Sequence, residues 1–183
     1  MKREHALLGV AAGALIAAAM VFWLILDDNG SDDGGEPAVA STPAEVEVVS
    51  VDSLLETAET RDTPIYWAGL PKDAELELSE PDGRRAYVRY LTGGAEAGDP
   101  RPFLTVGSYE IEDPASALRR QGKRSGGVVA SAPKGGVVYF DRDEPKSVYL
   151  AYPGVDVQVE VFAPSFQQAL QLVTSGEITP IAE

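Results

Sequence analysis

The residues that could do chemistry in this chain are few, and most are carboxylates. The chain has no cysteine and one histidine, His5, so a cysteine nucleophile is impossible and histidine catalysis is excluded for residues 45–183. The composition also argues against zinc, which prefers sulfur and nitrogen ligands, and we expect no cofactor. Glycoside hydrolysis needs two facing carboxylates. Any two of the 29 acidic residues could meet in space, but no spacing singles out a pair.

An acidic stretch later in the chain resembles the start of a calcium-binding loop. Asp141, Asp143 and Glu144 would supply the oxygen ligands that a divalent cation prefers. Arg142 interrupts them, however, and the glycine and bidentate glutamate that should follow are missing. The pattern favours a solvated loop, and we expect no metal site.

Ser131 and Lys134 have the Ser-x-x-Lys spacing of penicillin-binding enzymes. In those enzymes the two residues lie one helical turn apart, so that the amine helps to activate the hydroxyl. Here Pro133 and the glycines that follow Lys134 predict a turn between strands, and the chain is too short for that fold. We therefore expect no catalytic residue at this position.

A single concentrated basic cluster provides the candidate anion-binding site, which consists of Arg119, Arg120, Lys123 and Arg124. It could bind an anionic envelope polymer or phospholipid headgroups. The simpler interpretation is structural, because cations at the end of a helix complement the helix dipole. The segment 122–125 also lacks the spaced glycines of a phosphate-binding loop.

The N-terminal region predicts where these residues are located. Ala6 to Leu26 is an unbroken run of 21 uncharged residues, and at about 1.5 Å per residue it reaches the roughly 30 Å of a bilayer core. Lys2 and Arg3 precede this run, and no Lys or Arg follows it until Arg61. Since positive charge stays inside, we expect the N-terminus in the cytoplasm and the remaining chain outside.

We therefore predict a single-pass protein of the plasma membrane. Residues 1–5 would be cytoplasmic, 6–26 a signal anchor, 27–44 a flexible acidic linker and 45–183 one extracytoplasmic domain. Cleavage after Ala19 stays an alternative, because Ala17–Ala19 resembles a signal-peptidase site. Such cleavage would leave the apolar stretch 20–26 on the mature protein, which favours the anchor.

Charge and cysteine content restrict the partners. The net charge of −14 argues against binding nucleic acid or docking on an anionic lipid surface. An exported domain that folds without disulfides suits a bacterial envelope. Expected partners are the lipid bilayer, through the anchor, and an envelope protein or polymer. The sequence does not indicate an oligomeric state.

The patterning of residues 45–183 predicts an α+β domain of antiparallel sheet with about three helices on one face, because tight hairpins join the strands. Asp52 or Ser53 should cap the first helix, and Asp113 should cap the second. The aromatic residues on the strands could line a sugar-binding or peptide-binding face, although half-buried strand aromatics are mostly core. The expected helices are 51–59, 114 to about 124 and 165–173, and the expected strands are 63–70, 75–79, 85–91, 103–111, 128–131, 137–140, 147–152, 155–162 and 178–181.

Three stretches have a distinctive strand and loop texture, namely Tyr87–Leu91, Gly98–Tyr109, and Tyr149–Gly154 with Val157–Val161. Through them the chain resembles a group of uncharacterised, single-pass membrane-anchored proteins of high-GC Gram-positive (actinobacterial) bacteria, over about residues 64–180. The resemblance implies a location at the membrane and brings no active-site residues.

From these observations we expect a non-catalytic extracytoplasmic interaction or sensing module of the cell envelope. One alternative is a carboxylate-dependent hydrolase that acts on envelope glycans. The other is a module that binds an anionic polymer through the basic helix end.

Overall fold

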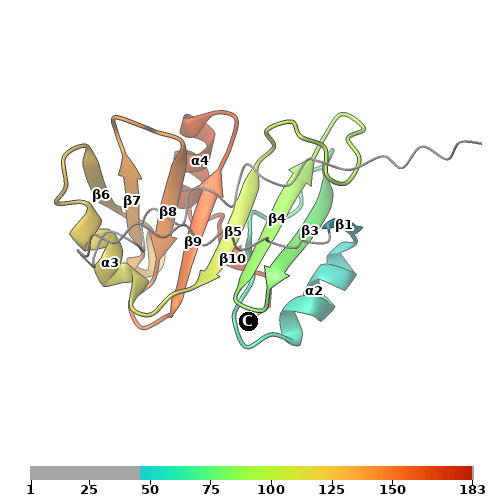
Figure 1. The fold of residues 1–183 in the computed structure, drawn as a ribbon, viewed down its shortest axis with the longest axis horizontal. Coiled ribbons are helices and arrows are strands. Elements are labelled where there is room, and N and C mark those ends of the chain that lie inside the picture. The colour runs from blue at the N-terminus through green and yellow to red at the C-terminus, as the bar shows by residue number, and fades with distance from the viewer. Residues whose placement is uncertain (1–45, 183) are drawn as a thin grey trace, which may run out of the picture.

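A computed structural model describes residues 46–182. Its centre is an eight-stranded antiparallel sheet with the strand order β1-β3-β4-β5-β9-β8-β7-β6 (Figure 1). The α+β class and the antiparallel sheet are thus confirmed. The strands are β1 Val46–Val49, β3 Glu75–Asp82, β4 Arg85–Leu91, β5 Thr105–Glu110, β6 Gly127–Ser131, β7 Val137–Asp141, β8 Ser147–Ala151 and β9 Val157–Phe162.

Three helices and a second, two-stranded sheet complete the described part of the chain. The helices are α2 Val51–Glu59, α3 Pro114–Gln121 and α4 Phe166–Ser175, and the small sheet pairs β2 Tyr66–Trp67 with β10 Thr179–Pro180. The strand expected over 63–70 is therefore mostly irregular, and its short regular part pairs with the end of the chain instead of joining the main sheet.

The sheet consists of two meanders that meet at one non-local pairing. Strands β3, β4 and β5 are consecutive neighbours, with a tight turn between β3 and β4 and the longer loop 92–104 between β4 and β5. Strands β6, β7, β8 and β9 are also consecutive neighbours, joined by short connections. Strand β5 pairs with β9, with Val106 opposite Val161. This pairing brings together segments about 50 residues apart in sequence, and it creates the middle of the sheet.

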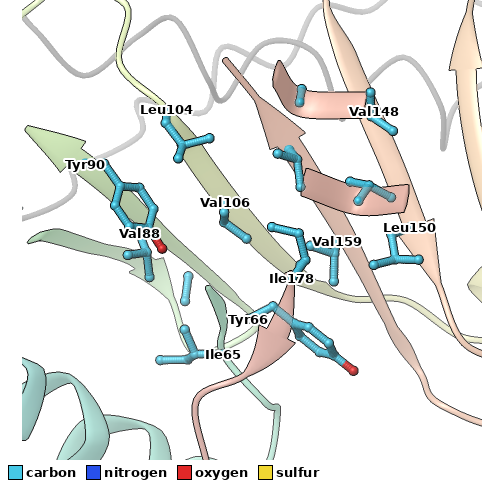
Figure 2. Packing of buried hydrophobic residues seen from close by; sticks show 14 of the residues in the cluster. Ile65, Tyr66, Val88, Tyr90, Leu104, Val106, Val148, Leu150, Val159 and Ile178 are labelled. Carbon is cyan, nitrogen blue, oxygen red and sulfur yellow. The ribbon is translucent and has the colours of Figure 1, made fainter. Parts of the chain in front are cut away.

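One face of the sheet, here called the first face, carries the main hydrophobic core. Figure 2 shows Val88, Val106, Val159 and Leu150 from four strands pointing to the same side, close to Ile178. Helices α2 and α4 and the small sheet pack on this face through further buried residues of the same cluster. The period-2 alternation of these strands places every second side chain there.

Helix α3 lies on the opposite, second face, so the expectation of three helices on one face is wrong. Its residues Ala115 and Leu118 form a separate buried cluster with Tyr139, Tyr149 and their neighbours. The adjacent residues of the same strands pack in the main core. Strands β7 and β8 are therefore buried on both faces, which explains their nearly continuous apolar sequence.

The local signals at the helix ends are mostly confirmed. Asp113 caps α3 with Pro114 at the first helical position, and Gly176 ends α4 in the left-handed conformation. The cap predicted for α2, at Asp52 or Ser53, is two or three positions too late. The N-cap is Ser50, whose hydroxyl accepts a hydrogen bond from Ser53 N at 3.0 Å.

The predicted signal anchor at 6–26, the cytoplasmic residues 1–5 and the linker 27–44 lie outside the described residues. Within residues 46–182, none of the helices is long and apolar enough to span a bilayer.

Candidate functional site

The middle of the second face is polar although it is buried. Side chains from neighbouring strands gather there between α3 and the loop 92–104, because their register positions share one face. Buried polar groups must be compensated by hydrogen bonds or charges, so this cluster is the first place to look for a function. Its members are Glu77, Tyr87, Thr105, Tyr109, Ser147, Tyr149, Gln158 and Glu160.

A glycine makes the centre of this cluster possible. Gly107 on β5 lies opposite Tyr87 on one side and Glu160 on the other. A Cβ atom at Gly107 would stand 2.8 Å from Tyr109 Oη, which is closer than real Cβ contacts allow. The missing side chain thus leaves room for the ring of Tyr109 to lie along its own strand, over Gly107, and to reach Glu160 on β9.

Glu160 is the central group, and it is only 7% exposed. Tyr109 Oη donates a hydrogen bond to Glu160 Oε2 at 2.7 Å, and Tyr149 Oη makes a longer bond to Oε1 at 3.4 Å. Burial raises the pKa of the Glu160 carboxyl, while the dipoles of Ser147, Tyr109 and Tyr149 act in the opposite direction. Within residues 46–182 the Ser147 hydroxyl makes no hydrogen bond, so it affects Glu160 only as a nearby dipole.

The phenols around Glu160 remain neutral donors. Burial, followed by the charge of Glu160, raises the pKa of both Tyr109 and Tyr149. Three buried polar atoms in this cluster, counting Ser147 Oγ, have no hydrogen-bond partner within residues 46–182; the other two are Tyr87 Oη and Gln158 Nε2. This arrangement can bind a proton, since the charged carboxylate is disfavoured by burial.

Glu160→Gln should therefore change how stability depends on pH. The raised pKa means that the Glu160 carboxyl stabilises the fold fully below its ordinary pKa of 4.5, and that this contribution is lost as the pH rises through the folded pKa. Glutamine does not titrate, so the stability of the variant relative to the natural protein should increase with pH, by at most about 1.4 kcal/mol per pH unit.

Urea denaturation of both proteins between pH 4 and 8 measures this difference. Tyr109→Phe provides the second variant, because it removes the hydrogen bond that lowers the Glu160 pKa. In that variant the loss of stability should extend to a higher pH. Parallel pH profiles for all three proteins would show that Glu160 ionises equally in the folded and unfolded states.

The other buried carboxylate of this face, Glu77, has a structural role. Arg89 Nη1 donates to Glu77 Oε1 at 2.5 Å, and Gly98 N donates to Oε2 at 2.5 Å. Arg89 Nη2 also donates to the carbonyl of Asp99. The pair thus ties strands β3 and β4 to the loop 92–104, with both carboxylate oxygens of Glu77 engaged.

Glu77 and Glu160 do not form a glycosidase-type pair. Three interstrand steps separate β3 from β9, so the two residues are about 15 Å apart at about 4.8 Å per step. Carboxylates in such enzymes stand about 5–9 Å apart.

The predicted basic cluster is located at the end of α3, where Arg119, Arg120, Lys123 and Arg124 are all exposed. Backbone hydrogen bonds from Lys123 N to Arg120 O and from Gly127 N to Arg124 O lead directly into β6. The residue that follows α3, Gly122, packs closely against β6, because a Cβ at Gly122 would stand 2.0 Å from a methyl carbon of Val129. The structure therefore places the cluster beside the first residues of β6.

The acidic stretch that resembles the start of a calcium-binding loop forms a turn. Asp141 Oδ1 accepts hydrogen bonds from the backbone N–H groups of Asp143 and Glu144, at 2.8 and 3.3 Å. No group of three or more residues that could hold a metal ion occurs among residues 46–182. The Ser-x-x-Lys spacing is likewise spread over a strand end, at Ser131, and a 3-10 turn, in which Lys134 has φ 58°.

The aromatic residues on the strands are mostly core, as expected. Tyr66 and Tyr90 belong to the main core, and Tyr90 Oη accepts a hydrogen bond from Ala68 N at 2.6 Å. Tyr87 and Tyr109 pack edge to face on the second face, with ring centroids 5.6 Å apart.

Sequence reasoning missed Glu160. A signal was present, since Glu160 and Gln158 interrupt a run of valines on a strand whose neighbours carry tyrosines.

No protein-family model, no curated protein and no solved structure matches this chain.

Proposed function

We propose that this protein is a non-catalytic interaction module of the bacterial cell envelope, anchored in the plasma membrane by residues 6–26, with residues 45–183 outside. The observation that carries the proposal is the open edge of strand β6 beside the exposed cations of α3. Strand β6 is the last strand of the sheet, and it pairs only with β7 among the described strands.

Open edges are usually protected in natural proteins. Charged residues, prolines or bulges prevent another strand from adding to the edge. Strand β6 has the sequence Gly-Val-Val-Ala-Ser, with none of these features in its pairing with β7. Val129 is 43% exposed. An uncharged edge with an exposed valine is suited to binding another extended segment.

The hydrolase alternative has weaker support, because the two buried carboxylates of the second face lie too far apart for glycoside hydrolysis. The polymer-binding alternative uses the same basic cluster as our proposal. It differs in that it requires only charge and does not involve the backbone of β6.

A photocrosslinking amino acid at position 129 of the full-length protein tests the proposal in intact cells. We expect a crosslinked adduct from position 129, because the edge is the proposed contact. Position 70 is the matched control, since Leu70 is also an exposed large apolar residue, at 53%, and lies away from β6. Equal adducts at both positions, or none at 129, would contradict the proposal.

The same experiment reports the orientation. Protease added to intact spheroplasts should remove the adduct, because the domain is proposed to lie outside the membrane. Protection of the adduct until lysis would place the domain in the cytoplasm.

A further inference from the structure

We infer that strand β6 binds an extended, acidic peptide segment of a partner protein, which adds to the sheet as a ninth strand with its acidic residues against the basic end of α3. This inference rests on the proposed function and names the class of partner.

The backbone of β6 has the groups that strand addition needs. Arg142 N donates to Gly126 O at 2.9 Å, just before β6 begins. Hydrogen-bonded pairs alternate along an antiparallel ladder, so the even-numbered residues of β6 bond to β7. Val129 and Ser131 therefore direct their N–H and C=O groups away from the sheet. Both residues are exposed.

The charge around this edge selects the partner. Arg119, Arg120 and Lys123 are exposed and form no ion pair with another residue of 46–182. They stand near the start of β6, because α3 contacts the strand through Gly122 and Val129. Carboxylates complement three such cations where they come into contact with them.

The orientation of the bound segment determines where its acidic residues lie. A partner strand antiparallel to β6 has its C-terminal end beside the start of β6, so its acidic residues should lie near its C-terminus. Asp141 and Asp143 converge on Gly126, next to β7. The acidic side chains should therefore meet Arg120 on α3 and Lys123 just after it, and not the first residue of the strand.

The opposite edge of the sheet has different chemistry. Strand β1 carries Glu47, which is exposed, and no basic residue lies within the strand. An acidic segment should therefore be repelled from β1, so this edge provides a control inside the same molecule.

Binding is measured by fluorescence anisotropy with the full-length protein in detergent. The first probe is a labelled nine-residue peptide with six alternating threonine and valine residues followed by Asp-Glu-Asp. We expect this probe to bind, and its affinity to fall as salt is raised, because exposed ion pairs are screened. Peptides with the three acidic residues at the N-terminus, or with three lysines in their place, should bind more weakly.

A backbone change in the probe tests strand addition without altering the protein. N-methylation of the peptide residues that face β6 removes their donors, so affinity should fall by about fivefold or more, since a hydrogen bond contributes about 1 kcal/mol. The same number of N-methyl groups on the alternate residues should have a smaller effect. Equal effects of the two methylation patterns would overturn strand addition.

Val129→Pro and Val48→Pro form the matched pair of protein variants. Each valine is 43% exposed. Tyr90 N donates to Leu104 O, so the even-numbered residues of β4 bond to β5 and the odd-numbered ones to β3. Followed through β3 to β1, this alternation directs the N–H of Val48 away from the sheet, as it does for Val129 on β6. Proline at an outward position breaks no ladder bond. Val129→Pro should lower the affinity for the probe about fivefold, and Val48→Pro should leave it unchanged.

Two charge variants test the cluster. Arg120→Gln with Lys123→Gln should lower the affinity for the probe by about three- to tenfold, as expected for two exposed ion pairs. Lys72→Gln with Arg84→Gln removes the same charge elsewhere and should leave the affinity unchanged. Equal losses in both pairs would show that net charge, and not this cluster, attracts the peptide.

The remaining outcomes are distinguishable. If no peptide binds while crosslinking at position 129 still captures a partner, this inference fails and the proposed function stands. If both proline variants abolish assembly of the protein with itself, the occupant of β6 is the β1 edge of a second copy, and the acidic partner is overturned.

Discussion

Arg89→Met is expected to destabilise the fold by about 3–5 kcal/mol, because it leaves a buried carboxylate without its counter-charge. Glu77 is 1% exposed, and its Oε1 accepts from Arg89 Nη1 at 2.5 Å. The guanidinium group also binds the carbonyls of Asp99 and Arg101 in the loop that covers this end of the sheet. Urea denaturation followed by circular dichroism measures the loss.

Arg101→Met is the matched control for this variant. Arg101 also lies over the ring of Phe103, at 5.2 Å compared with 5.5 Å for Arg89, but it is an exposed residue that pairs with Asp99. Its replacement should have a much smaller effect. Glu77→Leu combined with Arg89→Met should recover part of the stability, because it removes the stranded charge. Equal losses for Arg89→Met and Arg101→Met would show that Glu77 does not need its partner.

Leu118→Ala is expected to destabilise the protein by about 2–4 kcal/mol, through lost burial and the cavity that remains. Leu118 is 1% exposed and packs with Tyr139 and Tyr149 in a cluster separate from the main core. This variant therefore tests whether the second face has a core of its own. The free energy of unfolding from urea denaturation is the readout.

Leu70→Ala is the same substitution at a site that is 53% exposed. It should change the stability by no more than about 0.5 kcal/mol. If Leu118→Ala costs as little as Leu70→Ala, helix α3 does not pack against β7 and β8 on the second face.

Much of the local structure could be predicted from the sequence, because its signals act over a few residues. Asp113 followed by Pro114 starts α3, Gly176 ends α4, and Pro153-Gly154 joins β8 to β9. The alternation of apolar and polar residues in Arg85–Leu91 also indicates which side chains share a face of β4. Each of these signals depends on backbone geometry within one turn or one strand.

The errors occur where a contact between distant segments decides the outcome. The cap of α2 is a local exception, because Ser50 and neither Asp52 nor Ser53 caps the helix, through a hydrogen bond from Ser53 N. The predicted strand at 63–70 mostly lacks regular pairing, because its partner is β10 at the far end of the chain. No local pattern identifies such a partner.

The candidate sites show the same division. The basic cluster could be found from sequence because its members are neighbours in the chain, whereas its position beside an open edge depends on β6 being the last strand. The Glu160 cluster could not be found, because Tyr109 and Glu160 are 51 residues apart and meet only through the β5–β9 pairing.

The sequence by itself determined most of the elements and which side chains of a strand share a face, because these follow from the periods of helix and strand and from turn chemistry. The tertiary structure alone decided that α3 covers the second face, that Glu160 is buried among tyrosines and that β6 lies at an open edge. These outcomes follow from the order in which the strands pair, which joins segments far apart in sequence and does not depend on any single segment.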